Sequence, residues 1–205
     1  MDLSIGDGEA AVALARASVE AHLSGSHPRR GAWESGPFSE TRGVFVTINR
    51  ASSREDRLRG CIGFPHPVMR LGDAIVEAAV AASTEDLRFP PLTTSELDSV
   101  VFEVSALTLP TPLRPSRRAD LPGQVRIGVD GLIVSGSGTS GLLLPQVATE
   151  FGMSQTEFLS QACLKAGLPP GSWLEEGTTV QVFQAEIFAE ESPHGKVVRV
   201  ELEAA

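Results

Sequence analysis

Residues 43–64 read GVFVTINRASSREDRLRGCIGF. The β-branched and apolar run 44–48 predicts a strand, because such side chains fit a pleated, half-buried surface. Polar residues then fill positions 49–57, and a second run returns from Leu58. The spacing is too wide for a tight turn, so we expect two neighbouring strands joined by a loop.

A helical period precedes this segment. Apolar residues recur about every 3.6 residues across 9–24, with Asp7 as the expected cap and a glycine placed to end the helix. The chain from 25 to 40 is rich in glycine, proline and serine, which predicts a long loop. We expect two aromatic side chains to anchor this loop to the body of the protein, Trp33 and Phe38.

Two further helices follow along the chain. The spacing of apolar residues predicts one over 68–82, and Pro67 suits its first turn. Residues 154–157 read SQTE and fit the S-x-x-E capping box, in which two side chains satisfy backbone N–H groups. We expect the helix that this box opens to end at Gly167.

Strand patterns occupy much of the remaining sequence. We expect strands over 100–107, 180–188 and 197–202, and a hairpin within 124–134 that turns at Asp130-Gly131. The order strand, strand, helix thus occurs both before and after a position near about 115. This order predicts a mixed α+β fold with two similarly built halves.

Length and composition describe a globular protein. The chain has 205 residues, of which 41% are hydrophobic and 21% charged, so it can bury a sizeable core without metal or disulfide support. No run is long and apolar enough to predict a membrane span, and the first residues lack the features of a signal peptide. We therefore expect a single cytoplasmic domain without membrane association.

Charge and cysteine usage narrow the possible functions. The formal net charge of −9 disfavours nucleic acid as a partner. Cys61 and Cys163 are far apart and outside any C-x-x-C pattern, and the four histidines show no metal-ligand spacing. The sequence therefore predicts no disulfide scaffold, no metal site and no cofactor.

Residues 136–141 read GSGTSG and match the glycine pattern of dinucleotide-binding loops. A dinucleotide site needs that pattern to open a helix within a βαβ unit. Here LLLP at 142–145 follows directly, which is typical of another strand or a buried run. A flexible hairpin loop is the better interpretation.

The segment LRGCIG at 58–63 is the strongest candidate for a binding site. Gly60 and Gly63 would let backbone N–H groups approach a ligand, and Arg59 offers a guanidinium group to a carboxylate or phosphate. Five arginines lie between positions 50 and 70, although the whole chain is acidic. This contrast favours an anionic ligand or partner. The alternative is that the glycines bend a strand and the arginines form a solvated face.

Two other side chains each have two possible roles. Cys61 is a reactive thiol if Arg59 and a following helix lower its pKa, and otherwise a small buried hydrophobe. Glu103 is either a solvated strand residue or a buried carboxylate paired with Arg59 or Arg88. Cys163, on the amphipathic helix after 154, is expected to be buried and unreactive.

Five separated strings share the order and character of a known family: LRGCIG at 58–63 after GVFVT at 43–47, DLRFPPL at 86–92, EVS at 103–105, GLLLPQVA at 141–148, and CLKAGL at 163–168 followed by Trp173. On these strings the chain resembles the AMMECR domain family from the N-terminal helix to Phe188. Asp130-Gly131-Leu132 departs from the His-Gly-Leu of the family pattern. No role is therefore assigned to an imidazole at that position.

The resemblance implies an α+β fold with a barrel-like antiparallel sheet, helices and two related halves. It implies a single domain over 1–205 with sub-lobes near 1–115 and 116–205, and no established reaction. Family members in bacteria and archaea are associated with a Memo-like protein and a radical SAM enzyme, which are the partners that the resemblance implies. The family's suspected site maps to Arg59, Gly60, Cys61 and Gly63.

Two functions remain open from the sequence. In the first, a small anionic ligand binds Arg59, Gly60, Gly63, Arg88 and Glu103, and Cys61 is a catalytic nucleophile. In the second, the protein is a non-catalytic module that docks a protein partner through the same surface. A concave pocket with convergent polar groups around Cys61 favours the first function, and a flat apolar patch favours the second.

Overall fold

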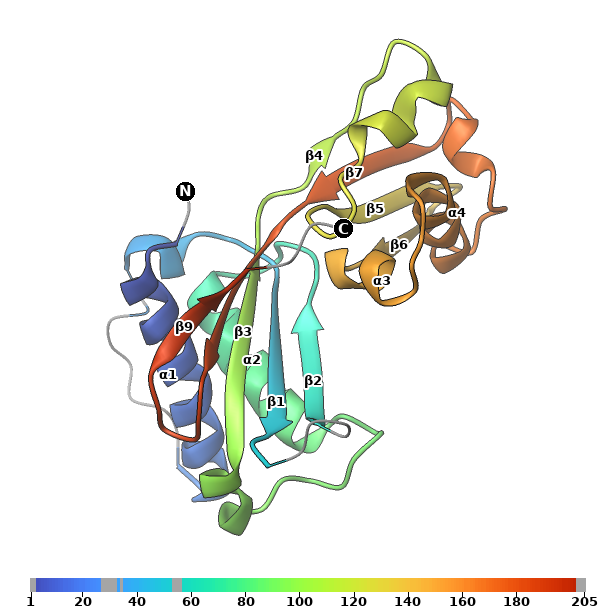
Figure 1. The fold of residues 1–205 in the computed structure, drawn as a ribbon. Helices are drawn as coiled ribbons and strands as arrows, with labels where there is room; N and C mark the ends of the chain where they lie inside the picture. The colour runs from blue at the N-terminus through green and yellow to red at the C-terminus, as the bar shows by residue number, and fades with distance from the viewer. Residues whose placement is uncertain (1–2, 27–32, 34, 53–56, 202–205) are drawn as a thin grey trace. The chain divides into compact units, whose positions relative to one another are not determined.

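The computed structural model describes residues 3–26, 33, 35–52 and 57–201. The chain divides into two compact units (Figure 1). Unit 1 contains Met1–Leu107 and Glu186–Val200, and unit 2 contains Thr108–Ala185 and Glu201–Ala205. The sequence places one boundary near about 115, whereas the chain leaves unit 1 after Leu107 and returns to it at Glu186.

Unit 1 is built on a five-stranded antiparallel sheet with the strand order β2-β1-β3-β8-β9. The pair of strands predicted on either side of the loop 49–57 is confirmed as β1 and β2, and the strand predicted over 100–107 is confirmed as β3. The bounds are Val44–Arg50 for β1, Leu58–Phe64 for β2, Val100–Leu107 for β3, Ala185–Glu190 for β8 and Val197–Val200 for β9.

Two helices pack on one face of this sheet, α1 (Ile5–Leu23) and α2 (Leu71–Thr84) (Figure 1). Helix α1 begins earlier than predicted, because Ser4 is the N-cap and Asp7 is the third helical residue of a capping box. Helix α2 begins later than predicted, because Arg70 is still extended and forms a β-bridge with Thr41.

The core of unit 1 lies between the sheet and these helices. Val44, Val46 and Ile48 of β1 are fully buried in one cluster with the alanines of α2. Because side chains alternate along a strand, the residues between them point to the opposite face. Phe38 is buried in this core and Trp33 packs against it, which confirms the predicted anchoring of the 25–40 loop.

Two buried ion pairs lie on the helix-covered face. Arg16 of α1 donates from Nε and Nη2 to the two carboxylate oxygens of Glu190, at 2.7 and 2.6 Å. Arg42 donates from Nη2 to Glu186 at 2.7 Å. The four side chains are each at most 10% exposed. The charged groups that enter this core are therefore neutralised by a partner.

Unit 2 contains a four-stranded antiparallel sheet with the order β4-β7-β5-β6. Its strands are β4 (Thr111–Pro112), β5 (Gly131–Gly136), β6 (Thr139–Leu143) and β7 (Thr179–Phe183), and its helices are α3 (Pro145–Glu150) and α4 (Gln155–Lys165). The predicted capping box of α4 is confirmed, since Ser154 and Glu157 bond each other's backbone N–H groups. Cys163 lies on α4 and is fully buried, as predicted.

The hairpin of unit 2 turns at a different place from the one predicted. Ser137 and Gly138, with φ of 51° and 78°, join β5 to β6, so GSGTSG is a hairpin loop as expected. The hairpin predicted at Asp130 is wrong, because Asp130 ends a turn in which its carboxylate accepts from the backbone and side chain of Arg126. The single strand predicted over 180–188 is two strands, β7 and β8, which belong to different sheets.

The α+β class with antiparallel sheets is confirmed, and each unit contains an antiparallel hairpin followed by helices. The barrel-like expectation is corrected: the structure has two separate open sheets, whose edge strands are β2 and β9 in one and β4 and β6 in the other. In the described part of the chain, no helix has the length and apolar character needed to cross a membrane.

Candidate functional site

Three polar side chains form a row on the face of the unit 1 sheet opposite to α1 and α2. Cys61 of β2 and Glu103 of β3 are both register partners of Thr47 in β1. Because neighbouring strands lie about 4.8 Å apart, Cys61 and Glu103 are about 10 Å apart with Thr47 between them. The Thr47 hydroxyl donates to the Cys61 Sγ at 3.3 Å. All three residues are half-buried.

Packing accounts for the two glycines of LRGCIG. A Cβ atom at Gly60 would lie 2.0 Å from the carbonyl oxygen of Ala82 in α2, so only glycine lets the strand and helix approach this closely. A Cβ at Gly63 would lie 2.4 Å from the ring of Phe45. The Phe45 ring therefore lies over Gly63 as an apolar wall on the same face as Cys61. A role of either glycine in ligand binding stays a prediction.

Arg59 points away from the row. The register of β1 and β2 shifts between Ile48 and Asn49, which marks a β-bulge at Arg59, and bulges redirect side chains. The Arg59 guanidinium is 4% exposed and donates from Nε to Glu96 at 2.8 Å and from Nη1 to the carbonyl of Pro90 at 2.9 Å. The side chain therefore fastens β2 to the 90–96 segment, and a ligand would have to displace Glu96 to bind it.

The charge of Arg59 also changes the acidity of its partner. The Arg59 guanidinium and the N–H and hydroxyl groups of Thr93 stabilise the Glu96 carboxylate and lower its pKa to about 2. Burial acts in the opposite direction but is the weaker influence. The pair is thus charged throughout the physiological range of pH.

Arg88 is the arginine that the structure brings to Cys61. The Asp86 carboxylate accepts from the Cys61 backbone N–H at 2.9 Å and from the Nε and Nη2 of Arg88 at 2.9 and 2.7 Å. The Nη2 of Arg88 also lies 3.5 Å from the Cys61 carbonyl oxygen. Asp86 and Arg88 together thus cap the free edge of β2 at Cys61, which would otherwise present unpaired backbone groups.

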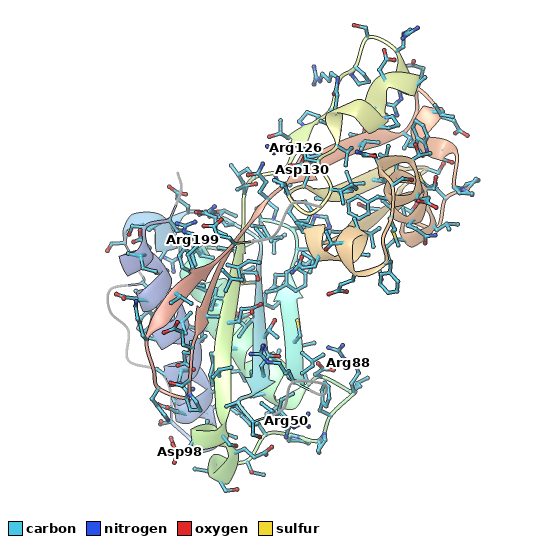
Figure 2. The ribbon with its side chains drawn as sticks, viewed as in Figure 1. Arg50, Arg88, Asp98, Arg126, Asp130 and Arg199 are labelled. Atoms are coloured by element: carbon cyan, nitrogen blue, oxygen red, sulfur yellow. The ribbon has the colours of Figure 1, made fainter. Side chains whose placement is uncertain are left out.

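Arginine side chains gather near this edge. Arg88 has 57% of its side chain exposed, and Arg88 and Arg50 both lie over the ring of Phe89. Figure 2 shows Arg50 and Arg88 near the end of the sheet at which β1 finishes and β2 begins. Arg88 thus brings a partly exposed guanidinium beside the row, with Asp86 as its ion-pair partner, whereas the positive charge expected over 50–70 stays a prediction.

The surroundings of Cys61 do not lower its pKa, as the reactive-thiol alternative requires. Burial raises its pKa above the ordinary value, and the charges of Glu103 and Asp86 raise it further. The hydrogen bond from Thr47 and the charge of Arg88 lower the pKa but do not compensate for burial. A ligand that neutralises Glu103 or excludes water would therefore change the reactivity of this thiol.

Glu103 is a half-buried carboxylate, and neither Arg59 nor Arg88 pairs with it. Burial raises its pKa, and the positive charge of Arg57 lowers the pKa only in part. Among the residues that the structure describes, none donates a hydrogen bond to its oxygens. Glu103 thus matches neither alternative in full: it is half-buried rather than solvated, and Arg59 and Arg88 pair with other carboxylates.

A family model described as AMMECR1 matches residues 12–188. This range includes every residue of the site just described. The chain belongs to the AMMECR1 family. The resemblance drawn from the five strings is confirmed by this match.

Relatives of the whole chain agree with the assignment. The AMMECR1 chain is 47% identical to a protein of Thermofilum pendens, with 98% of each chain covered. It is 45% identical to protein MJ0810 of Methanocaldococcus jannaschii, again with 98% of each chain covered. The crystal structure of uncharacterized protein PH0010 from Pyrococcus horikoshii is similar at a TM-score of 0.83 and 44% identity, covering 95% of this chain and 97% of that one.

Sequence reasoning missed four residues around the AMMECR1 motif: Phe45, Thr47, Arg57 and Asp86. Thr47 alternates with buried valine and isoleucine in β1, which is a signal that it faces away from the core. Its partner could not be known, because the register of β1 and β2 depends on the loop between them and on the bulge. No local pattern indicates that Asp86 accepts from the backbone of Cys61.

Proposed function

We propose that this AMMECR1 protein binds a small anionic ligand on the sheet face that carries Cys61, Thr47 and Glu103. The observation that supports this function is a row of thiol, hydroxyl and carboxyl groups in which an arginine charge lowers the pKa of the group at each end. Arg88 acts on Cys61, and Arg57 acts on Glu103. Polar groups that converge from several strands beside an apolar wall are typical of small-molecule sites.

The ligand in this proposal contacts the exposed guanidinium of Arg88. Arg88 uses Nε and Nη2 on Asp86, and among the described residues its Nη1 has no acceptor, so Nη1 can donate to an anion. Asp86 fixes the side chain before the ligand arrives, which reduces the entropy lost on binding. Arg57 adds a second positive charge, which acts on Glu103.

Titration calorimetry with acetate, butyrate and inorganic phosphate tests this function. We expect saturable binding of at least one anion, and Arg57→Ala and Arg88→Ala should each weaken it by about 1.5–3 kcal/mol, the range for hydrogen bonds to charged groups. Arg117→Ala is the matched control, because the Arg117–Asp120 pair is exposed and lies in unit 2. Binding that neither site variant weakens, or no binding of any of the three anions, would contradict the proposal.

An enzymatic form of this function uses Cys61 as the nucleophile. The thiol must then give its proton to solvent water or to the bound ligand, with the Thr47 hydroxyl and Arg88 stabilising the thiolate. Loss of turnover in Cys61→Ser with ligand binding retained would support this step, once a substrate is found. Equal turnover in Cys61→Ser would remove the nucleophilic role.

Docking of a protein partner through the same surface is a second candidate, favoured by Leu87. Leu87 is fully exposed although the residues on both sides are fixed, since Asp86 holds Cys61 and Arg88 and the Phe89 N–H donates to the Asp86 carbonyl. A rigidly presented apolar side chain beside charged residues is typical of an anchor in an interface.

The Memo-like protein and the radical SAM enzyme associated with the family are the partners in this second candidate. Leu87→Glu should abolish binding of either purified partner, measured by biolayer interferometry, and leave anion binding unchanged. Leu109→Glu is the control, because Leu109 is an exposed leucine in unit 2. Unchanged partner binding in Leu87→Glu would exclude this surface.

A further inference from the structure

Glu103 is the group in the row that has no hydrogen-bond partner among the described residues. It lies on the middle strand of the five, half-buried, and in the described part of the chain no hydrogen-bond donor or ion-pair partner reaches its carboxylate. A carboxylate removed from water without a donor is costly, so such groups bind either a proton or a ligand. The other buried glutamates of this sheet, Glu186 and Glu190, have arginine partners.

The charged and titratable groups around Glu103 come from each neighbouring element. From the β1–β2 side they are Arg57, which lowers the pKa of Glu103, and Cys61, which is protonated. From β8, Glu186 and Glu190 point to the opposite face, where they pair with arginines of the helix side. Among the described residues, Arg57 is the arginine whose charge acts on Glu103 before a ligand arrives.

An anion that enters beside Glu103 adds a like charge at short range. Two carboxylates in one site cannot both stay ionised, so one of them takes up a proton, which they can then share in a hydrogen bond. A monocarboxylate fits this arrangement, because its carboxylate can accept from the protonated Glu103 and from Arg57, whose charge acts on Glu103. The Phe45 ring over Gly63 offers an apolar surface to the rest of such a ligand.

We propose that the ligand of this site is a small monocarboxylic acid with an apolar body, and that it enters with one proton, which Glu103 holds. The inference rests on the proposed anion-binding function and adds the ligand class and its dependence on protons. A phosphate dianion fits less well, because it brings two negative charges to a site with two arginines and a neighbouring carboxyl group.

Calorimetry of the wild-type protein in two buffers of different ionisation enthalpy measures the protons taken up on binding. With butyrate as the probe we expect uptake approaching one proton per site near neutral pH, and an affinity that falls by up to about tenfold for each pH unit above neutrality. Acetate should bind more weakly than butyrate because it lacks the apolar body, and inorganic phosphate should bind most weakly.

Glu103→Gln tests the residue, since the amide keeps a hydrogen-bond donor but cannot take up a proton. We expect butyrate to bind this variant with no proton uptake and with an affinity that no longer depends on pH. Glu9→Gln, an exposed position on α1, is the control and should behave as the wild type. Thermal unfolding of Glu103→Gln shows whether the variant is folded. If it is not, calorimetry of the wild-type protein in the two buffers still shows whether a proton is taken up on binding.

The outcomes separate the two proposals. Butyrate binding that depends on Arg88 but takes up no proton would overturn the role of Glu103 and leave the anion site standing. Tighter binding of phosphate than of butyrate would overturn the ligand class alone. No saturable binding of butyrate, acetate or phosphate would remove the anion site and this inference together.

Discussion

The two faces of the unit 1 sheet differ in whether their buried carboxylates are paired with arginine. On the face covered by α1 and α2, Glu190 and Glu186 each bond an arginine and are at most 10% exposed on their side chains. On the other face, Glu103 is half-buried beside a partly exposed thiol, and no described residue pairs with it in this way. Pairing with arginine neutralises the charges of the first face, whereas a carboxyl and a thiol group on the second face stay partly exposed.

The same isosteric change on the two faces gives the most direct test. Glu190→Gln should lower the free energy of unfolding by about 3–5 kcal/mol, because it leaves the Arg16 charge buried and uncompensated. Glu103→Gln should change it little or raise it at neutral pH, because the amide removes an unfavourable buried charge. Urea denaturation of both variants measures the difference. Similar losses for both would mean that Glu103 is a structural residue.

The close approach of β2 and α2 gives the next largest effect. Gly60→Ala places a methyl group 2.0 Å from a helix carbonyl oxygen, which cannot move without disturbing α2. We expect a loss of about 1–3 kcal/mol, the range for overpacking in a core. Gly123→Ala is the control, since nothing lies within 4 Å of its added Cβ. Equal stabilities of the two variants in urea would show that the helix and strand can separate.

The two thiols allow the reactivity of a partly exposed residue on the sheet face to be compared with that of a buried residue in unit 2. Cys61 is partly exposed and Cys163 is fully buried, and burial raises the pKa of both. We expect a limiting thiol reagent to modify Cys61 roughly tenfold or more faster than Cys163, because Cys163 reacts only when unit 2 opens locally. The rate at Cys61 should rise as pH rises above neutrality, because more thiolate forms.

Mass spectrometry of the labelled peptides measures both rates. In Cys61→Ser only Cys163 can react, so its slower rate is measured alone. Labelling of Cys163 first would make Cys61 the packed residue and remove it from the candidate site.

The Arg59–Glu96 pair gives the smallest expected effect, and one that depends on pH. The pKa of Glu96 is lowered from 4.5 to about 2 in the folded protein, so the pair contributes stability above the unfolded pKa. That contribution is lost as pH falls from 4.5 towards 2. Glu96→Gln should therefore be less stable than the wild type at neutral pH, with the difference shrinking in acid. Thermal unfolding across this range measures it, and a constant difference would contradict the pairing.

Local sequence signals predicted the elements of the fold well where their cause is local. The capping box of α4 and the strand β3 occur as predicted, because each depends on side chains close in sequence. The predicted hairpin is misplaced because the Asp130 carboxylate accepts from Arg126 within its own turn and also from Gln184, which is distant in sequence. The start of α2 was misplaced because Thr41 holds Arg70 in an extended conformation.

The sequence by itself determined the family and the α+β class, and it singled out LRGCIG on β2 as the candidate site. Only the tertiary structure decided which side chains meet there. The β-bulge turned Arg59 towards Glu96, and the register brought Thr47 between Cys61 and Glu103. A shift of one residue in pairing moves every side chain to the other face, and no local pattern sets that register across a loop. Burial then raised the pKa of Cys61 and Glu103, because desolvation depends on the whole fold.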